Sequence, residues 1–313
     1  QRRMLVPCLE RNDFWWMGFR SGDGVRPPRL NNWNPLINSG WLTAALLMEG
    51  DPERRLAAIH KSIRSLDRFI DPYPRDGGCD EGPGYWSAAG ARLFECLEAL
   101  HSATNGEIDV YDDPLIRNIG RYITRVHIDD RYFVNFADAD AIVSPSPFLV
   151  YQYGKRIQDP DMMCMGAYFA EREDVATRGV EERLNHPKNS IVRQIPALLS
   201  VAELLEAECR QPLPRDVWLP EIEVMTARDQ ARTADGFYIA AKGGHNAESH
   251  NHNDVGHCIV YVDGKPVIID PGVEIYTIKT FSPNRYDIWT MQSAYHSLPT
   301  IDGVMQSEGL AHA

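Results

Sequence analysis

Histidine, asparagine and aspartate crowd into one short stretch of the chain, SHNHNDVGH at 249–257. Imidazole nitrogens and carboxylate oxygens often move protons in active sites, and both are common ligands of zinc. A stretch of this composition is either a loop of turn-forming residues or part of a functional site. A single histidine is more often a satisfied structural residue, but a cluster of histidines with further acidic and histidine partners favours a site.

The residues after this stretch supply such partners. Asp263-Gly264 lies between two apolar runs, and this pair is typical of a two-residue hairpin turn. The returning strand would carry Asp270 back to the level of the histidines, where one of them, Asp270 and His296 would form a set suited to zinc. Ideal hairpin pairing puts Asp270 opposite His257. His252 would join the set only if the segment bends away from the strand, so both histidines remain open.

Two polar patches lie earlier in the chain. The first is NNWNP at 31–35, where asparagine as a helix N-cap explains part of the pattern, although three asparagines around Trp33 exceed what one cap requires. The second is DGGCDEGPGYW at 76–86. It is either a loop anchored by Tyr85 and Trp86 or a glycine-shaped wall that holds these two rings beside a sugar.

The elements that must position these groups change in kind along the chain. From about residue 36 to 210, apolar residues recur at helical spacing, for example in the segments Ala88 to Leu100, Leu115 to Val126 and Ile191 to Glu208. After Pro212 and Pro214 the runs are short and β-rich. We therefore expect a helical domain over residues 1–214 and a β-domain over 215–313 that is too short to complete a sandwich.

Composition limits the class of protein. With 32 Lys+Arg against 44 Asp+Glu the net charge is −12, which disfavours nucleic acid and anionic membranes as partners. No apolar run is long enough to span a bilayer, and six scattered cysteines without a CxxC pair predict free thiols. The first residues lack the pattern of a signal peptide, but a periplasmic or extracellular location stays our expectation.

Taken in order, NNWNP, DGGCDEGPGYW, GGHNAESHNHNDVGHCIVYVDGKPVIIDPGVEIYT and YHSLPTIDG resemble the heparinase II/III-like polysaccharide lyases, which include alginate lyases. The resemblance runs from about Asn31 to Gln306, and the SHNHND…IDPG segment is its most specific part. It implies an incomplete toroid of paired α-helices followed by an antiparallel β-sandwich, with the active site between them. In this chain both ends of that architecture would be truncated.

The activity that the resemblance implies is β-elimination on a uronate-containing polysaccharide. The proton at C5, next to the carboxylate, is removed, and the bond to the 4-oxygen breaks to leave an unsaturated sugar. Such a reaction needs a group that neutralises the carboxylate, a base for C5 and an acid for the departing oxygen.

Each need has a candidate by resemblance. Tyr85 is the acid, and also the base when the proton and the leaving group lie on one face of the sugar. His250 is the base for the opposite face, and Asn34 or Asn32 would hydrogen-bond the carboxylate. A tyrosine near its reference pKa of about 10 is a poor base at neutral pH, so we expect cationic or donor groups beside Tyr85.

The metal site of the family carries over onto His252, Asp270 and His296, with zinc as a structural or site-organising ion. Ser297 follows the last histidine where relatives often have Asn, and a serine can still hydrogen-bond a ligand. Several relatives also carry a histidine where this chain has Trp33. Further candidates for contact with the substrate or its anions are Trp33, Trp86, Glu81 and Arg285, with Arg20 and Arg156 on composition only.

The resemblance implies an acidic polysaccharide or oligosaccharide as the partner, and the charge balance slightly favours an unsulfated polyuronate. Two other classes stay open. A glycoside hydrolase would use paired carboxylates among Asp76, Asp80 and Glu81, but it gives the histidine cluster no role. A noncatalytic glycan-binding protein is the third class.

Overall fold

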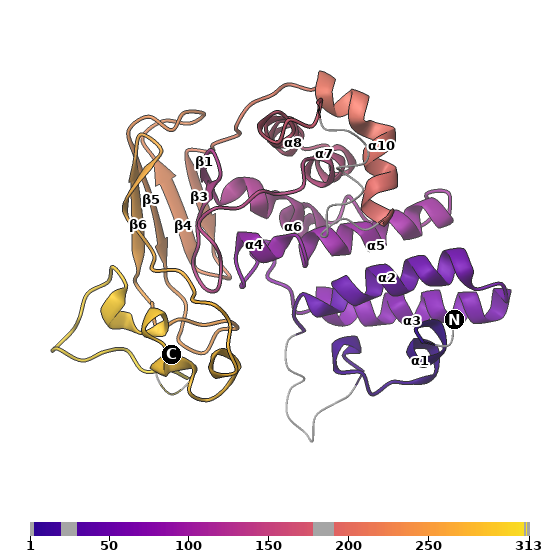
Figure 1. The fold of residues 1–313 in the computed structure, drawn as a ribbon, viewed down its shortest axis with the longest axis horizontal. Helices are drawn as coiled ribbons and strands as arrows, with labels where there is room; N and C mark the ends of the chain where they lie inside the picture. Colours follow the sequence, from indigo (N-terminus) through magenta and orange to yellow (C-terminus); the bar gives the residue numbers. More distant parts are fainter. Residues whose placement is uncertain (1–2, 20–29, 178–190, 310, 312–313) are drawn as a thin grey trace.

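The computed structural model describes residues 3–19, 30–177, 191–309 and 311. Along the chain, α-helices come first and an antiparallel five-stranded sheet follows (Figure 1). This order confirms the predicted change from helices to strands, and the expected boundary near residue 214 falls between the last helix and the first strand of the sheet. Among the described residues, no helix is both long and apolar enough to cross a bilayer. All six cysteines are free.

The helices are short to medium in length and pack on their neighbours in the chain, α2 on α3 and α7 on α8. Three of them start with a proline directly after an aspartate, because proline suits the first helical position and Asp51, Asp113 and Asp159 each accept hydrogen bonds from backbone N–H groups of the first turn. Their bounds are α1 Leu5–Glu10, α2 Trp33–Met48, α3 Pro52–Ile70, α4 Pro83–Trp86, α5 Gly90–Ala103, α6 Pro114–Arg125, α7 Pro147–Arg156, α8 Pro160–Arg172 and α10 Ile191–Glu206. Single 3-10 turns are η1 Trp15–Met17, η2 Lys279–Phe281, η3 Arg285–Asp287, η4 Trp289–Met291 and η5 Ser293–Tyr295.

The sheet is a meander in which each strand pairs with the next one along the chain. Its strands are β3 Asp216–Leu219, β4 Val224–Arg228, β5 Phe237–Lys242, β6 Cys258–Val262 and β7 Lys265–Ile268. The predicted hairpin turn is confirmed, since Asp263 and Gly264 join β6 to β7 with φ of 48° and 70°, as a turn of two left-handed residues requires. A register shift between Val260 and Tyr261 then displaces the pairing from the ideal one.

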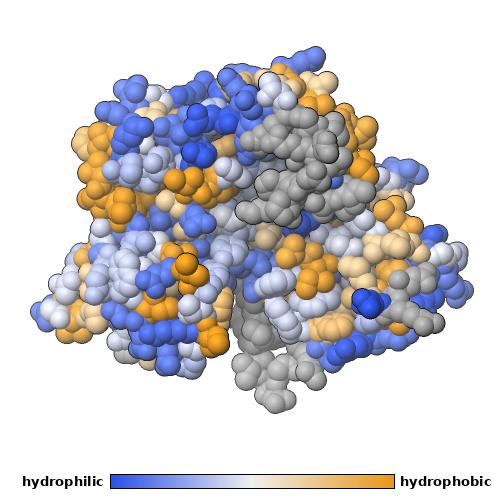
Figure 2. Space-filling model, in the orientation of Figure 1, coloured by the Kyte–Doolittle hydropathy of each residue, from blue (hydrophilic) through white to orange (hydrophobic). Residues whose placement is uncertain are grey.

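The two faces of the sheet differ in burial. On β5, Tyr238 and Ala240 are buried in the main core, whereas Phe237 and Ile239 are 61% and 37% exposed. Figure 2 shows hydrophobic residues gathered on the outer side of the sheet, at the left of the view. The sheet therefore packs one face on the rest of the molecule and leaves an apolar face uncovered among the described residues.

A small ribbon links the helices to the sheet. Strands β1 His127–Asp129 and β2 Tyr132–Phe133 pair with each other after α6. Buried Arg228 of β4 donates hydrogen bonds to the carbonyl oxygens of His127 and Ile128, which fixes the ribbon against the sheet. The loop after β2 is thereby held where helices and strands meet.

Candidate active site and metal centre

The structure brings two of the predicted catalytic residues together from distant parts of the chain. Tyr85 lies in α4, a single turn whose preceding residue, Gly82, has φ of 91°. His250 lies in the loop between β5 and β6 and itself has φ of 54°, a left-handed conformation that a non-glycine residue adopts at some energetic cost. The centroids of the two rings are 5.9 Å apart.

The ring of His250 is held between two carboxylates. Its Nδ1 lies 2.7 Å from Asp138 Oδ2, and its Nε2 lies 3.3 Å from Glu81 Oε2. Burial alone would lower the pKa of His250, but the hydrogen bond to Asp138 and the charge of Glu81 outweigh burial and raise it. Since Nδ1–H donates to Asp138, the lone pair of a neutral His250 is on Nε2, the nitrogen that faces Glu81, and this nitrogen can take a proton.

The hydroxyl of Tyr85 has a different environment from the one that the resemblance predicts. It shares a hydrogen bond of 2.6 Å with the hydroxyl of Tyr276. Burial raises the pKa of Tyr85, and the charges of Asp138 and Glu81 raise it further against the opposing effect of Tyr276. Tyr276 is a donor group of the kind we expected, but burial and the two carboxylates outweigh its effect, so the expected lowering of the pKa of Tyr85 does not occur. A phenol that keeps its proton suits an acid better than a base.

The two candidate asparagines divide into one that faces the site and one that does not. Asn32 donates from Nδ2 to Glu81 Oε2 at 2.7 Å and so joins the group around His250. Asn34 is fully buried, and its Nδ2 donates to the carbonyl oxygens of Trp16 and Ser65 at 2.8 and 2.9 Å. Asn34 thus ties α2 to the neighbouring segments and has no amide hydrogen left for a substrate carboxylate.

Among the predicted substrate contacts, Trp33 is 49% exposed and Trp86 is only 1% exposed. Trp86 packs in the main core and donates from Nε1 to the carbonyl oxygen of Ile119, so it does not contact a sugar. Arg156 pairs with Glu98, and Arg20 lies outside the described residues.

Arg285 is not a free anion-binding side chain either. Its Nη2 lies 2.6 Å from Asp138 Oδ1, and its other nitrogens donate to the carbonyl oxygens of Asn251 and Thr280. Arg285 therefore holds the loop that contains His250 and His252 (the histidine loop) in place.

Of the carboxylates proposed for a hydrolase, Asp76 is engaged by backbone groups. Asp76 accepts hydrogen bonds from the backbone N–H groups of Gly78, Glu221 and Ile222, which joins its loop to the start of the sheet. A carboxylate used in this way is structural. The loop provides Glu81 to the site instead, 3.3 Å from His250.

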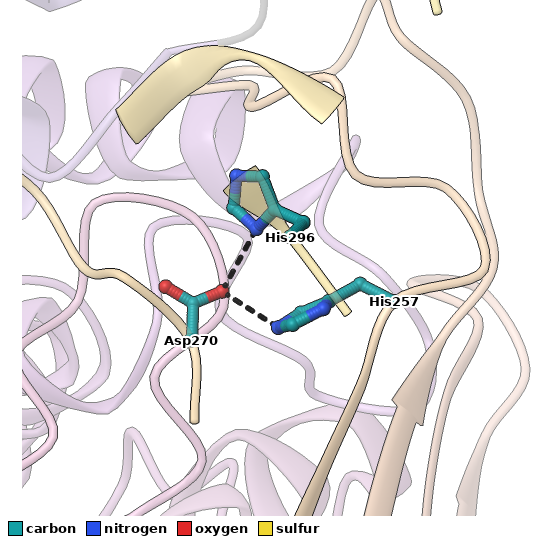
Figure 3. Close-up of side chains that lie close together, drawn as sticks. All are labelled: His257, Asp270 and His296. Atoms are coloured by element: carbon teal, nitrogen blue, oxygen red, sulfur yellow. Dashed lines mark ion pairs between the residues drawn. The ribbon is translucent and has the colours of Figure 1, made fainter. Parts of the chain in front are cut away.

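A second cluster lies beside the first and can bind a metal ion. Figure 3 shows His257, Asp270 and His296 pointing toward one another, and one ligand atom from each lies within 4.8 Å of the others. Asp270 Oδ2 is 3.1 Å from His257 Nε2 and 3.5 Å from His296 Nδ1. All three side chains are buried. Burial alone would raise the pKa of Asp270, but its histidine neighbours lower it, so it is a carboxylate.

His252, a fourth residue, also has a buried ring nitrogen without a hydrogen bond beside this cluster. Among the described residues, four buried atoms in or beside this cluster make no well-aligned hydrogen bond, although His257 Nε2 and Asp270 Oδ2 lie 3.1 Å apart: His252 Nδ1, His257 Nε2, Asp270 Oδ2 and His296 Nδ1. The rings of His252 and His296 are 5.6 Å apart between centroids. Buried polar atoms are normally paired, so a group of orphans fits a site for a cation. The bent histidine segment thus places both His252 and His257 near His296.

Asp138 is not among the residues that sequence patterns single out, yet it touches most of the site. It lies in the loop after β2, its carboxylate is fully buried, and it contacts His250, His252 and Arg285. Its surroundings in the sequence, NFADADA, contain two aspartates among apolar residues, and Asp140 is exposed, so the pattern does not show which carboxylate is buried. Tyr276, the hydrogen-bond partner of Tyr85, is likewise absent from the predicted site.

Comparison with known proteins gives matches in sequence and in fold. Residues 212–312 match the sequence model of the family described as Heparinase II/III-like, C-terminal. No curated protein matches the chain. A crystal structure of heparinase III is similar with a TM-score of 0.62 and 14% identity, over 89% of this chain and 40% of that one. The heparan sulfate lyase HepC from Pedobacter heparinus is similar with a TM-score of 0.56 and 15% identity, over 91% of this chain and 38% of that one.

These matches agree with the resemblance that the motifs indicated. At such identities the structural likeness establishes the fold alone, and this chain spans about 40% of the length of the solved proteins. The sequence match covers the segment that carries the histidine cluster and Asp270. Residues 212–312 are therefore similar to the C-terminal region of heparinase II/III-like proteins, and the chain shares the fold of about 40% of heparinase III.

Proposed function

We propose that this protein is a polysaccharide lyase that cleaves a uronate-containing glycan by β-elimination. The observation that carries the proposal is the meeting of Tyr85 and His250, 5.9 Å apart between ring centroids, at the junction of helices and strands. Tyr85 can give a proton and His250 can take one. Together they supply the acid and the base that the elimination needs.

The mechanism follows from the protonation states. His250 Nε2 takes the C5 proton, and the electron pair left on C5 forms the C4–C5 double bond while the C4–O bond breaks. The Tyr85 hydroxyl gives its proton to the departing oxygen. The raised pKa of Tyr85 supports His250, and not Tyr85, as the base. Afterwards the proton on His250 must return to Tyr85 through solvent to restore both groups.

The substrate carboxylate needs a partner that spreads the charge developing on C5. Asn32 is our candidate for this role, since its amide donates to Glu81, which lies 3.3 Å from His250. Glu81 holds Asn32 in this position, since its Oε2 accepts from Asn32 Nδ2 at 2.7 Å and lies 3.3 Å from His250 Nε2.

We assign the metal ligands by tautomer. His252 Nε2 lies 3.1 Å from Asp138 and His296 Nε2 lies 2.9 Å from the carbonyl oxygen of Thr290, so each carries its hydrogen on Nε2 and has a lone pair on Nδ1. His257 Nδ1 accepts the N–H of Ser297 at 2.9 Å, which leaves the hydrogen on Nε2. On these tautomers we propose His252, Asp270 and His296 as the ligand set, with His257 Nε2–H facing Asp270, although the ligand atoms that lie within 4.8 Å of one another are those of His257, Asp270 and His296.

A zinc ion held by this set would organise the histidine loop and add positive charge beside the site. The base and the acid of the reaction are protein side chains.

The glycan class is an acidic polysaccharide. One of the similar solved proteins is a heparan sulfate lyase. Here the excess of acidic residues and the engagement of Arg285 by protein groups favour an unsulfated polyuronate over a sulfated one. We further propose that the helices form part of a toroid and that the sheet is one half of a sandwich, because its outer face is apolar and exposed. A periplasmic or extracellular location fits such a substrate.

The test is an assay on a substrate panel. The protein is incubated with alginate, polygalacturonate, hyaluronan and heparan sulfate while ultraviolet absorbance and new reducing ends are both followed. A lyase produces a conjugated double bond with each new end, and we expect this on an unsulfated uronate. New ends without absorbance would indicate a hydrolase, and binding without either signal would indicate a glycan-binding protein.

A further inference from the structure

The carboxylate of Asp138 connects the two clusters of the site. Its Oδ2 lies 2.7 Å from His250 Nδ1, and its Oδ1 lies 3.1 Å from His252 Nε2. Arg285 donates to the same Oδ1 at 2.6 Å. One buried side chain therefore contacts both the proposed base and a proposed metal ligand, each through the ring nitrogen that does not react.

The shape of the loop makes these contacts specific. His250 has φ of 54°, and this turn of the backbone lets residues 250 and 252 present their rings to one carboxylate. Arg285 also donates to the carbonyl oxygens of His250 and Asn251. The loop is thus held to Asp138 by the imidazoles of His250 and His252. The guanidinium of Arg285 also bonds Asp138 and donates to the loop backbone.

Such contacts fix histidine tautomers. An imidazole that donates from one nitrogen to a carboxylate has its lone pair on the other nitrogen, and the carboxylate also increases the basicity of that lone pair. Asp138 thereby leaves the lone pair of His250 on Nε2, the nitrogen that faces Glu81, and the lone pair of His252 on Nδ1, in a ring that lies 5.6 Å from that of His296 between centroids. An asparagine in its place has a single acceptor oxygen, and its NH₂ group cannot accept a hydrogen bond.

We propose that Asp138 is a positioning residue that sets the reactive nitrogen of both histidines and so couples proton transfer to metal binding. The inference rests on the proposed function for the role of His250, but its prediction for His252 concerns metal binding alone. Asp138 does not touch the glycan, because its side chain is 0% exposed.

The test compares Asp138→Asn with the full-length wild-type protein and with Asp140→Asn. Asp140 is exposed, lies two positions along the same loop, and is close enough to Tyr85 to raise the pKa of that residue. No hydrogen bond from Asp140 to either histidine occurs in the part of the chain that the structure describes. The control thus removes an equal charge and leaves the two imidazole contacts in place.

Zinc affinity is measured by competition with a chromophoric chelator, and kcat and KM are measured on the best glycan of the panel. Asp138→Asn is expected to weaken zinc binding by about 10–100-fold and to lower kcat with KM within about twofold, while Asp140→Asn binds zinc like wild type. Unchanged zinc affinity in Asp138→Asn would overturn the coupling. So would a raised KM with unchanged kcat, because that pattern means substrate binding.

A second measurement needs no variant and decides the matter if Asp138→Asn does not fold. Nitrogen NMR of protein with labelled histidines reports which ring nitrogen carries hydrogen. We expect Nε2–H in His252 and Nδ1–H in neutral His250, and the opposite tautomer in either residue contradicts the role of Asp138. If no glycan is cleaved, the proposed lyase function fails, whereas zinc affinity and the His252 tautomer still test that role.

Discussion

Burial and the charges of Asp138 and Glu81 raise the pKa of the Tyr85 hydroxyl, and its hydrogen bond with Tyr276 opposes this rise only in part. Tyr85 therefore stays protonated up to a pH above its reference pKa of about 10. Deprotonation at higher pH would remove the acid of the proposed elimination.

This environment predicts the alkaline side of the pH profile. The decline of kcat/KM that reports loss of the Tyr85 proton should lie above a pH of about 10, because the folded pKa is raised and the protonated form persists to higher pH. The measurement is a pH series of initial rates on the best glycan, with protein stability checked at each pH. A tyrosine-dependent decline at a clearly lower pH would mean that Tyr85 works as phenolate.

The metal ligands can be separated by two substitutions. His252→Ala removes a proposed ligand, and we expect zinc affinity to fall by more than about 100-fold. His257→Gln removes a donor to Asp270, and we expect a loss within the range of about 10–100-fold that is typical of groups supporting a ligand. Chelator competition measures both. A larger loss in His257→Gln than in His252→Ala would show that His257 is the ligand.

At the scale of elements, two asparagines near the start of α2 have different roles. Asn32 reaches Glu81, while Asn34 bonds backbone oxygens near η1 and α3. Because an unsatisfied buried group costs about 1–3 kcal/mol, Asn34→Ala should lower the free energy of unfolding by about that amount. Asn32→Ala should mainly lower lyase activity.

Urea unfolding followed by tryptophan fluorescence measures the first effect, and the glycan assay measures the second. The two variants are matched, since they remove the same side chain two positions apart. The assignment is wrong if Asn32→Ala is the less stable variant while Asn34→Ala loses activity at full stability.

Local patterns are enough to predict most of these elements. The segments expected from Leu115 to Val126 and from Ile191 to Glu208 correspond to α6 and α10, and the Asp263-Gly264 turn joins β6 to β7. Apolar periodicity and turn chemistry are properties of short stretches, so a single sequence reveals them.

Contacts between distant segments are harder to predict. Asp138 meets His250 and His252 across more than 100 residues, so no spacing rule connects them. The prediction that Trp86 faces a sugar is wrong, because burial on its helix turn depends on α6 packing over it, as its hydrogen bond to Ile119 indicates. The choice between His252 and His257 needs the tautomers, which the partners Asp138 and Ser297 set.

At the scale of the whole molecule, the site exists only where helices and sheet meet. Tyr85, Glu81 and Asp138 come from the helical part of the chain, and His250, Tyr276 and the metal cluster come from the part with the strands. Arg228 fixes the ribbon that precedes Asp138 against the sheet. Correct docking of the two parts is therefore a condition for the proposed site to form.

We propose that the site at this junction catalyses β-elimination on a uronate-containing glycan with Tyr85 as the acid. The most direct measurement is the ultraviolet absorbance of the unsaturated product from wild type, Tyr85→Phe and the control Tyr276→Phe on the same glycan. We predict a steady rise for wild type, a rate lower by about 10²–10⁴-fold for Tyr85→Phe, and a much smaller loss for Tyr276→Phe. Unsaturated product formed by Tyr85→Phe at the wild-type rate would contradict the claim.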